Sequence, residues 1–125
     1  MYEVTVTREL IAQHFLTVPD PGPEGELHSH RFEVVLTLEG PELNEYDYLT
    51  DIDDVKRVLD GLEERYADAT LNELPEFEGY NPSVERFSRV VFERAVEGVD
   101  TAPLERVAVR IWEDDEACAG FERAV

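Results

Sequence analysis

Apolar and polar residues alternate along HSHRFEVVLTLE, residues 28–39. A period of two over this length predicts a β-strand with one buried face. That face carries Phe32, Val34, Leu36 and Leu38, and Gly40 ends the strand. The rest of the chain is expected to supply its neighbours in an antiparallel sheet.

Three further strands are predicted. The first alternates over residues 2–7 and can continue to Leu16. A rigid loop rich in proline and glycine, residues 19–25, separates it from the strand at 28–39. The other two strands are expected at residues 106–113 and 119–124, near the C-terminus.

Two helices are predicted between these pairs of strands. Thr50 or Asp51 can cap the first, in which apolar residues recur at helical spacing from residue 52 to residue 66. Asn81-Pro82-Ser83 predicts the start of the second, with Asn81 as the cap and Pro82 at the first helical position. The order ββααββ predicts a single α+β domain over residues 1–125, with a four-stranded antiparallel sheet and both helices on one face.

The chain is strongly acidic. Its 125 residues include 30 Asp and Glu against 11 Lys and Arg, a formal net charge of -19. No basic stripe is present to neutralise phosphates, so nucleic acids and anionic membranes are excluded as partners. The single cysteine, Cys118, excludes an intrachain disulfide. No export signal or long apolar run is visible, so a cytoplasmic protein is expected.

This acidic, lysine-poor composition predicts a halophilic protein. At molar salt the Debye length is about 3 Å, which screens the repulsion between surface carboxylates. The melting temperature is therefore expected to rise steeply from dilute buffer to molar KCl. A melting temperature that stays flat over this range would contradict the prediction.

All three histidines of the chain fall in one short region, as His14, His28 and His30. Residues two apart on a strand share a face, so His28 and His30 can converge on one ion, and His14 can join them from a neighbouring antiparallel strand. Three imidazoles and a water make a catalytic zinc site. The alternative is that His28 and His30 are polar residues on a solvated face. The clustering favours zinc.

The order of elements and the residues at their junctions resemble the 6-pyruvoyl-tetrahydropterin synthase family, which includes 6-carboxy-tetrahydropterin synthase. The resemblance covers nearly the whole chain. It is carried by His14, residues 24–30, Asp51, residues 67–72, residues 81–85 and Glu113, in this order.

The resemblance implies a tunnelling fold, in which small sheets join into trimeric barrels that stack into hexamers. It also implies zinc on the three histidines, an active site between subunits, and 7,8-dihydroneopterin triphosphate as the substrate. The glutamate at position 113 would hold the edge of the pterin. A homo-oligomer, trimer or hexamer, is therefore expected.

The sequence departs from the family at the positions whose side chains transfer protons in the reaction. The family has a catalytic Cys at the position of Glu24 and an Asp-His pair at the positions of Ala67 and Asp68. A carboxylate beside zinc is a competent general base, and the resemblance includes a subgroup with Glu at this position that forms 6-hydroxymethyl-7,8-dihydropterin. Glu24 is the first catalytic candidate, and Asp68, which could relay a proton, is the second. Both could instead be solvated loop acids.

Two residues are candidates for binding the pterin. Glu113 follows an alternating strand, where its carboxylate can accept two N–H groups of the ring. Ser83 can offer hydroxyl or backbone contacts, although helix capping explains it nearly as well. The sequence thus predicts a zinc-dependent lyase acting on the side chain of 7,8-dihydroneopterin triphosphate or a close relative. The alternative is an inactive family member that binds pterins or purines. Possible products belong to deazapurine (queuosine or archaeosine) or folate biosynthesis.

Overall fold

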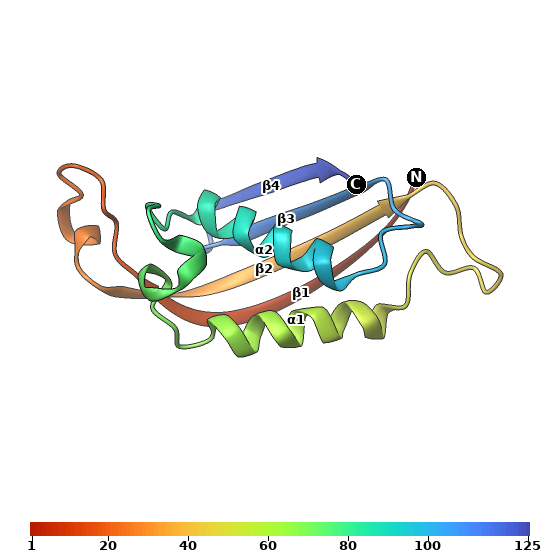
Figure 1. The fold of residues 1–125 in the computed structure, drawn as a ribbon, viewed down its shortest axis with the longest axis horizontal. Helices are drawn as coiled ribbons and strands as arrows, with labels where there is room; N and C mark the ends of the chain where they lie inside the picture. The colour runs from red at the N-terminus through yellow and green to blue at the C-terminus, as the bar shows by residue number, and fades with distance from the viewer.

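The computed structural model describes residues 1–125 as a four-stranded antiparallel sheet covered by two helices (Figure 1). The strands are β1 (Tyr2–His14), β2 (His28–Gly40), β3 (Arg106–Trp112) and β4 (Cys118–Ala124), in the spatial order β1-β2-β3-β4. The helices are α1 (Ile52–Tyr66) and α2 (Val84–Gly98), with short 3-10 turns at Gly22–Gly25, Leu71–Glu73 and Pro75–Phe77. The predicted α+β class and ββααββ order are confirmed.

The long pair β1–β2 forms one half of the sheet. Its register runs from Tyr2 opposite Gly40 to His14 opposite His28, so the two strands end together at the pair of histidines. Beyond that pair, residues 15–27 form a loop that projects past the end of the sheet (Figure 1). The first strand therefore ends at His14, and does not continue to Leu16.

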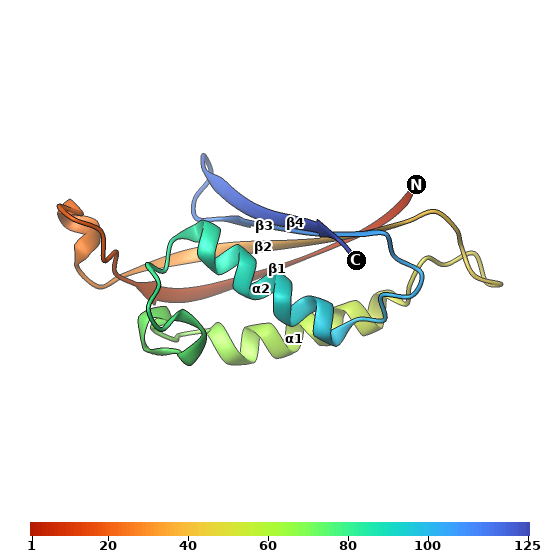
Figure 2. The ribbon, with the colours of Figure 1, turned by 45° about the horizontal axis from the view of Figure 1, so that its top comes forward.

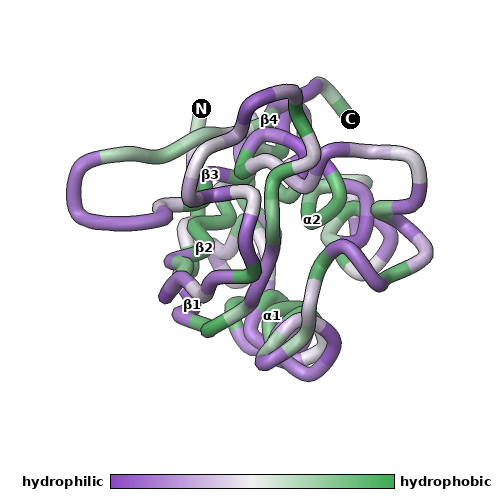
Figure 3. The backbone as a smooth tube through the Cα atoms, turned by 90° about the vertical axis from the view of Figure 1, so that its left-hand side faces the viewer, coloured by the Kyte–Doolittle hydropathy of each residue, from purple (hydrophilic) through white to green (hydrophobic).

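Both helices lie on the same face of the sheet (Figures 2 and 3). Helix α1 packs against β1, and α2 packs against β3 and β4. The core between the layers contains the predicted strand face of β2 and the apolar side of α1 from Val55 to Tyr66, whereas Ile52, the first residue of the predicted helical pattern, is exposed. The apolar side of α2 completes the core. Its largest fully buried side chains include Tyr66, Phe32, Phe77, Phe87 and Phe92. No helix is long and apolar enough to cross a membrane.

The two helix starts differ in how well the sequence predicts them. Asp51 caps α1, since its carboxylate accepts a hydrogen bond from the backbone N–H of Asp53. The predicted cap of α2, Asn81, is wrong: the cap is Ser83, whose hydroxyl accepts from the backbone N–H of Arg86. Pro82 consequently lies before the helix. The side chain of Asn81 is used elsewhere, in a contact described below.

A charged cluster ties the helices to the connection between them. Arg65 donates two hydrogen bonds of 2.6 Å to the carboxylate of Glu76. The buried Tyr66 hydroxyl donates to the same carboxylate at 2.7 Å, and Arg94 of α2 lies 3.1 Å away. The hydrogen bond from Arg65, followed by that from Tyr66, lowers the pKa of Glu76 to about 2 despite its burial.

Glu76→Gln is expected to lower the free energy of unfolding by about 1–3 kcal/mol at neutral pH, because a partly buried charge-assisted network is broken. The folded-state pKa of Glu76 is depressed, so its contribution is full above the ordinary value of 4.5 and is lost as the pH falls toward about 2. Urea unfolding at pH 7 and pH 3.5, in molar KCl, checks both statements. Glu122→Gln, which removes an exposed pair with Arg106, is the matched control and should have a much smaller effect, because solvent screens an exposed pair. A Glu76→Gln deficit that is equal at both pH values would contradict the assignment.

Candidate metal centre and cavity

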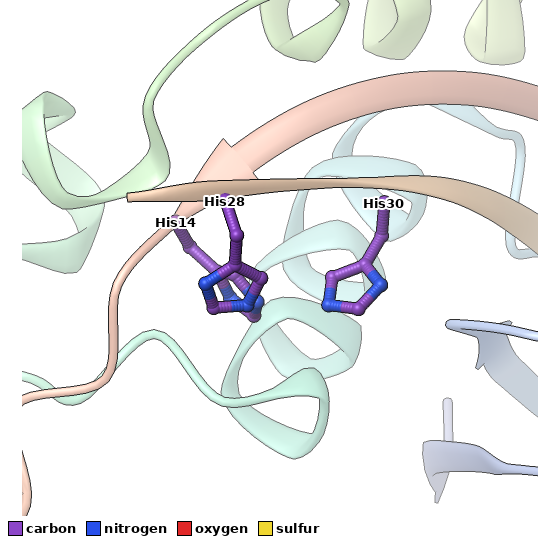
Figure 4. A group of neighbouring side chains, drawn as sticks. All are labelled: His14, His28 and His30. Carbon is purple, nitrogen blue, oxygen red and sulfur yellow. The ribbon is translucent and has the colours of Figure 1, made fainter. Parts of the chain in front are cut away.

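Three imidazole rings meet at the open end of the β1–β2 pair. His14 and His28 face each other across the two strands, and His30 is the next residue along the same face of β2. The ring centroids of His14 and His28 are 4.5 Å apart, and each lies within 5.3 Å of the centroid of His30. Figure 4 shows all three rings on the same side of the strands. The sequence prediction that these residues converge therefore agrees with their placement.

Hydrogen bonds to the backbone orient two of these rings. The Nδ1 of His14 lies 2.8 Å from the carbonyl oxygen of Pro82, and the Nδ1 of His28 lies 2.8 Å from that of Glu26. A carbonyl can only accept, so in both rings Nδ1 carries the proton. In the neutral form of each ring, Nε2 then has a free lone pair. This is the tautomer in which metal-binding histidines are commonly held by an outer partner.

The donor set fits a divalent metal. The Nε2 atoms of His28 and His30 are buried and have no hydrogen-bond partner. Buried polar atoms without a partner are rare in proteins, and an ion is one of the explanations for them. One nitrogen from each of the three rings lies within 4.8 Å of the others. Three nitrogen ligands in this arrangement suit zinc with one open coordination position.

The local environment keeps His14 unprotonated. Burial lowers the pKa of His14, and the nearby His28 and His30 lower it further, while the hydrogen bond to Pro82 opposes the shift. Only the neutral imidazole can ligate a metal. His14 is thus available as a ligand at neutral pH.

A cavity of about 290 Å³ opens beside the histidines. This is close to the lower end of the range for small-molecule sites, about 300 Å³. His14 lines it, and so do three of the residues singled out in the sequence: Glu24, Ser83 and Glu113. The structure therefore brings a metal candidate, a base candidate and both binding candidates to one place.

Each of these residues is presented by a different local structure. Glu24 is exposed on the 3-10 turn of the projecting loop, and Ser83 is the cap of α2. Glu113 opens the hairpin between β3 and β4, where its backbone N–H donates to the carbonyl of Ala117 at 3.1 Å. The carboxylate of Asp114 accepts from two backbone N–H groups in the same turn and fixes its shape.

Asp68 lies outside this cavity. It is exposed, follows α1 with a positive φ of 61°, and donates its backbone N–H to the carbonyl of Ile11. Within this chain its carboxylate is not among the groups that line the cavity with Glu24. A role for Asp68 in proton transfer stays a prediction.

Sequence reasoning missed three polar residues that line the cavity: Asn81, Glu85 and Cys118. The signal for Asn81 and Glu85 was their position at the start of α2, beside Ser83. Cys118 belongs to the last strand, and its sequence position gives no sign that it lies near Glu24. The register of the β3–β4 hairpin places it opposite Trp112, next to Glu113, and so at the cavity.

The four-stranded antiparallel sheet with two helices on one face is the tunnelling fold. A sequence model described as 6-pyruvoyl tetrahydropterin synthase matches residues 3–124. The chain therefore belongs to the 6-pyruvoyl tetrahydropterin synthase family. No curated protein matches the chain significantly by sequence.

Solved structures of similar fold come from several organisms. The 6-pyruvoyltetrahydropterin synthase of Plasmodium vivax has a TM-score of 0.82 at 15% identity, over 99% of this chain and 98% of that chain. The enzyme of Caenorhabditis elegans has a TM-score of 0.78 at 17% identity, over 100% and 97%. A putative dihydroneopterin aldolase from Vibrio cholerae has a TM-score of 0.54 at 16% identity, over 100% and 98%. At these identities the likeness establishes the fold. Two structures of the Plasmodium vivax protein are described as variants in which a catalytic glutamate is replaced by alanine or cysteine.

Proposed function

We propose that this protein is a zinc-dependent lyase that acts on the side chain of 7,8-dihydroneopterin triphosphate or a close relative. The observation that carries the proposal is the pair of buried, unpartnered Nε2 atoms of His28 and His30, which lie close to His14 beside a cavity lined by three carboxylates. A protein that only bound a pterin ring would have no need of a Lewis acid at this place. Family membership supports the same class of reaction.

The residues of the chain divide the work as follows. His14, His28 and His30 would hold the metal, which when bound polarises the hydroxyls of the substrate side chain and lowers their pKa. Glu24 would accept a proton from the substrate as general base. The Plasmodium vivax relative supports this role, since it is described as having a catalytic glutamate. Asp68 would act in proton relay only if another subunit brings it to the cavity.

Recognition of the pterin would fall to two other residues that line the cavity, Glu113 and Ser83. The carboxylate of Glu113 can accept two N–H groups from one edge of the ring, which fixes the orientation of the side chain toward the metal. Ser83 uses its hydroxyl as an acceptor for the N–H of Arg86, so its remaining hydroxyl proton is the group it can offer to a ligand.

We further propose that the protein works as a closed homo-oligomer, a trimer or a hexamer. Strands β1 and β4 lie at the two edges of the sheet, and edge strands of small sheets need cover. Glu24 is exposed in the single chain, whereas a general base works best where bulk water is excluded. A neighbouring copy over the projecting loop would meet both needs.

The second candidate is a pterin- or purine-binding protein without turnover. It is favoured by the exposed position of Asp68 outside the cavity, together with Ala67 where the family has an Asp. In that case the cavity would retain ring recognition by Glu113 while the proton relay is lost.

One assay separates these functions. The zinc-loaded protein is incubated in molar KCl with 7,8-dihydroneopterin triphosphate and with its dephosphorylated form, and the products are identified by mass. A 6-pyruvoyl, 6-carboxy or 6-hydroxymethyl product that requires zinc supports the lyase and identifies the reaction. Tight binding of the pterin without any product supports the binder. If the protein neither binds the pterin nor converts it, both proposed functions are refuted.

A further inference from the structure

The last residues of β1, up to His14, are held on two sides. On one side is β2. On the other, the segment that follows α1 runs along the free edge of β1, where Asp68 donates its backbone N–H to the carbonyl of Ile11 at 2.6 Å. The backbone N–H of Gln13 donates to the carbonyl of Ala69 at 2.9 Å. This edge of β1 is therefore covered from residue 11 onward.

Beyond His14, asparagine side chains continue this pairing. The amide of Asn72 accepts from the N–H of Phe15 at 3.0 Å and donates to the carbonyl of Phe15 at 2.9 Å. Asn81 accepts from the N–H of Thr17 at 2.9 Å. The side chain of Asn72 thus does for Phe15 what a paired residue of a neighbouring strand would do, with one donor and one acceptor.

Phe15, which these contacts hold, is connected to two candidate functional residues, His14 and Glu24. His14 directly precedes Phe15, and its own ring donates to the carbonyl of Pro82. Leu16 directly follows Phe15, and its N–H donates to the backbone carbonyl of Glu24 at 2.8 Å. A residue that fixes the backbone of Phe15 therefore acts on the ligand on one side and on the loop of the base on the other.

We infer that Asn72 is a positioning residue for the metal centre: through Phe15 it sets the place of His14 and the approach of Glu24. The inference rests on the proposed function, because it assumes that the three histidines hold a metal. Its physical basis is that β1 and β2 have no pair beyond His14 and His28, so a strand end in this position would fray without another partner. Outer groups that orient a ligand commonly change metal affinity by 10–100-fold when they are removed.

Asn72 is a cleaner subject for a test than Asn81. Asn81 lines the cavity, so its replacement could change ligand binding directly, whereas Asn72 does not line it. Two variants separate the roles of the side chain. Asn72→Ala removes both hydrogen bonds, and Asn72→Asp keeps the shape of the side chain but cannot donate to the carbonyl of Phe15.

The experiment measures the affinity of each variant for Zn²⁺ and Co²⁺ in molar KCl, with the visible absorption of bound Co²⁺ as a report of coordination geometry. Both variants are expected to bind metal about 10–100-fold more weakly than the wild type and to show an altered Co²⁺ spectrum. Asn44→Ala is the matched control. The Asn44 side chain also accepts two backbone N–H groups, those of Tyr46 and Tyr48, but in a loop that lines neither the cavity nor the histidine cluster.

The outcomes distinguish this inference from the proposed function. If the wild type binds no metal, the proposed metal site is wrong and the inference falls with it. If the wild type binds metal and Asn72→Asp has the same affinity and spectrum, only the positioning role is wrong. Equal losses in Asn44→Ala and the Asn72 variants would also overturn it, because the effect would then follow from general destabilisation. If Asn72→Ala does not fold, the isosteric Asp variant carries the test.

Discussion

Glu24→Gln is expected to lower the turnover of the zinc-loaded protein by about 10²–10⁴-fold, the usual contribution of a general base. Glutamine keeps the size and polarity of the side chain but cannot accept a proton at neutral pH. Because Glu24 is exposed on a short turn, the fold and the melting temperature should stay as they are. Binding of the pterin should also be little changed, since Glu113 and not Glu24 is the residue proposed to hold the ring. The measurement is product formation by mass at saturating substrate.

Glu26→Gln is the matched control for this experiment. Glu26 is an exposed glutamate two residues further along the same loop, and its side chain does not line the cavity. It should retain nearly full turnover. If Glu24→Gln were as active as Glu26→Gln, the general base would have to be sought elsewhere in the cavity, where Glu85 and Cys118 are the remaining titratable residues outside the binding and metal sets.

His28→Ala is expected to abolish stoichiometric binding of zinc. One of only three protein ligands is lost, so the fall in affinity should exceed the roughly 100-fold that removal of an outer partner costs. Metal content after dialysis against a weak chelator, together with calorimetric titration, measures the effect. Turnover should be lost in parallel.

Ser29→Ala tests whether this effect is specific. Ser29 lies between the two histidines but is exposed on the other face of β2, so its loss should leave the metal in place. A His28→Ala protein that still held one zinc per chain would contradict the ligand assignment. In the wild type, the affinity for zinc should fall as the pH is lowered, because protons compete with the metal for the imidazoles.

Much of the fold could be predicted from periodicity. The alternation along β2 identified the residues that are buried against the helices, and β3 and β4 differ from their predicted ranges by one residue at one end. The ends of elements were harder. Asparagine is a common helix cap, yet the side chain of Asn81 instead accepts a hydrogen bond from the backbone N–H of Thr17, more than sixty residues away in sequence. Only the folded chain brings these two segments together, and Ser83 takes the cap in its place.

Part of the candidate site could also be predicted from the sequence. The three histidines could be placed together because strand geometry alone puts residues 28 and 30 on one face, and an antiparallel neighbour supplies residue 14. The position of Cys118 could not be predicted, because it depends on the register of the last hairpin. The exposed place of Asp68 follows from a backbone turn with positive φ that its sequence does not indicate.

The turn that carries Glu24 has one more consequence. The side chain of Glu24 is exposed and takes part in no hydrogen bond or ion pair within the chain, and the residue lies on a loop beyond the end of the sheet. A substitution of Glu24 leaves the packing of the sheet against the helices intact. A substitution of His14, which is buried, does not. The residue at this position can therefore change, for example from a thiol to a carboxylate, without any need to repack the scaffold. New reactions on old substrates are most easily reached from architectures of this kind.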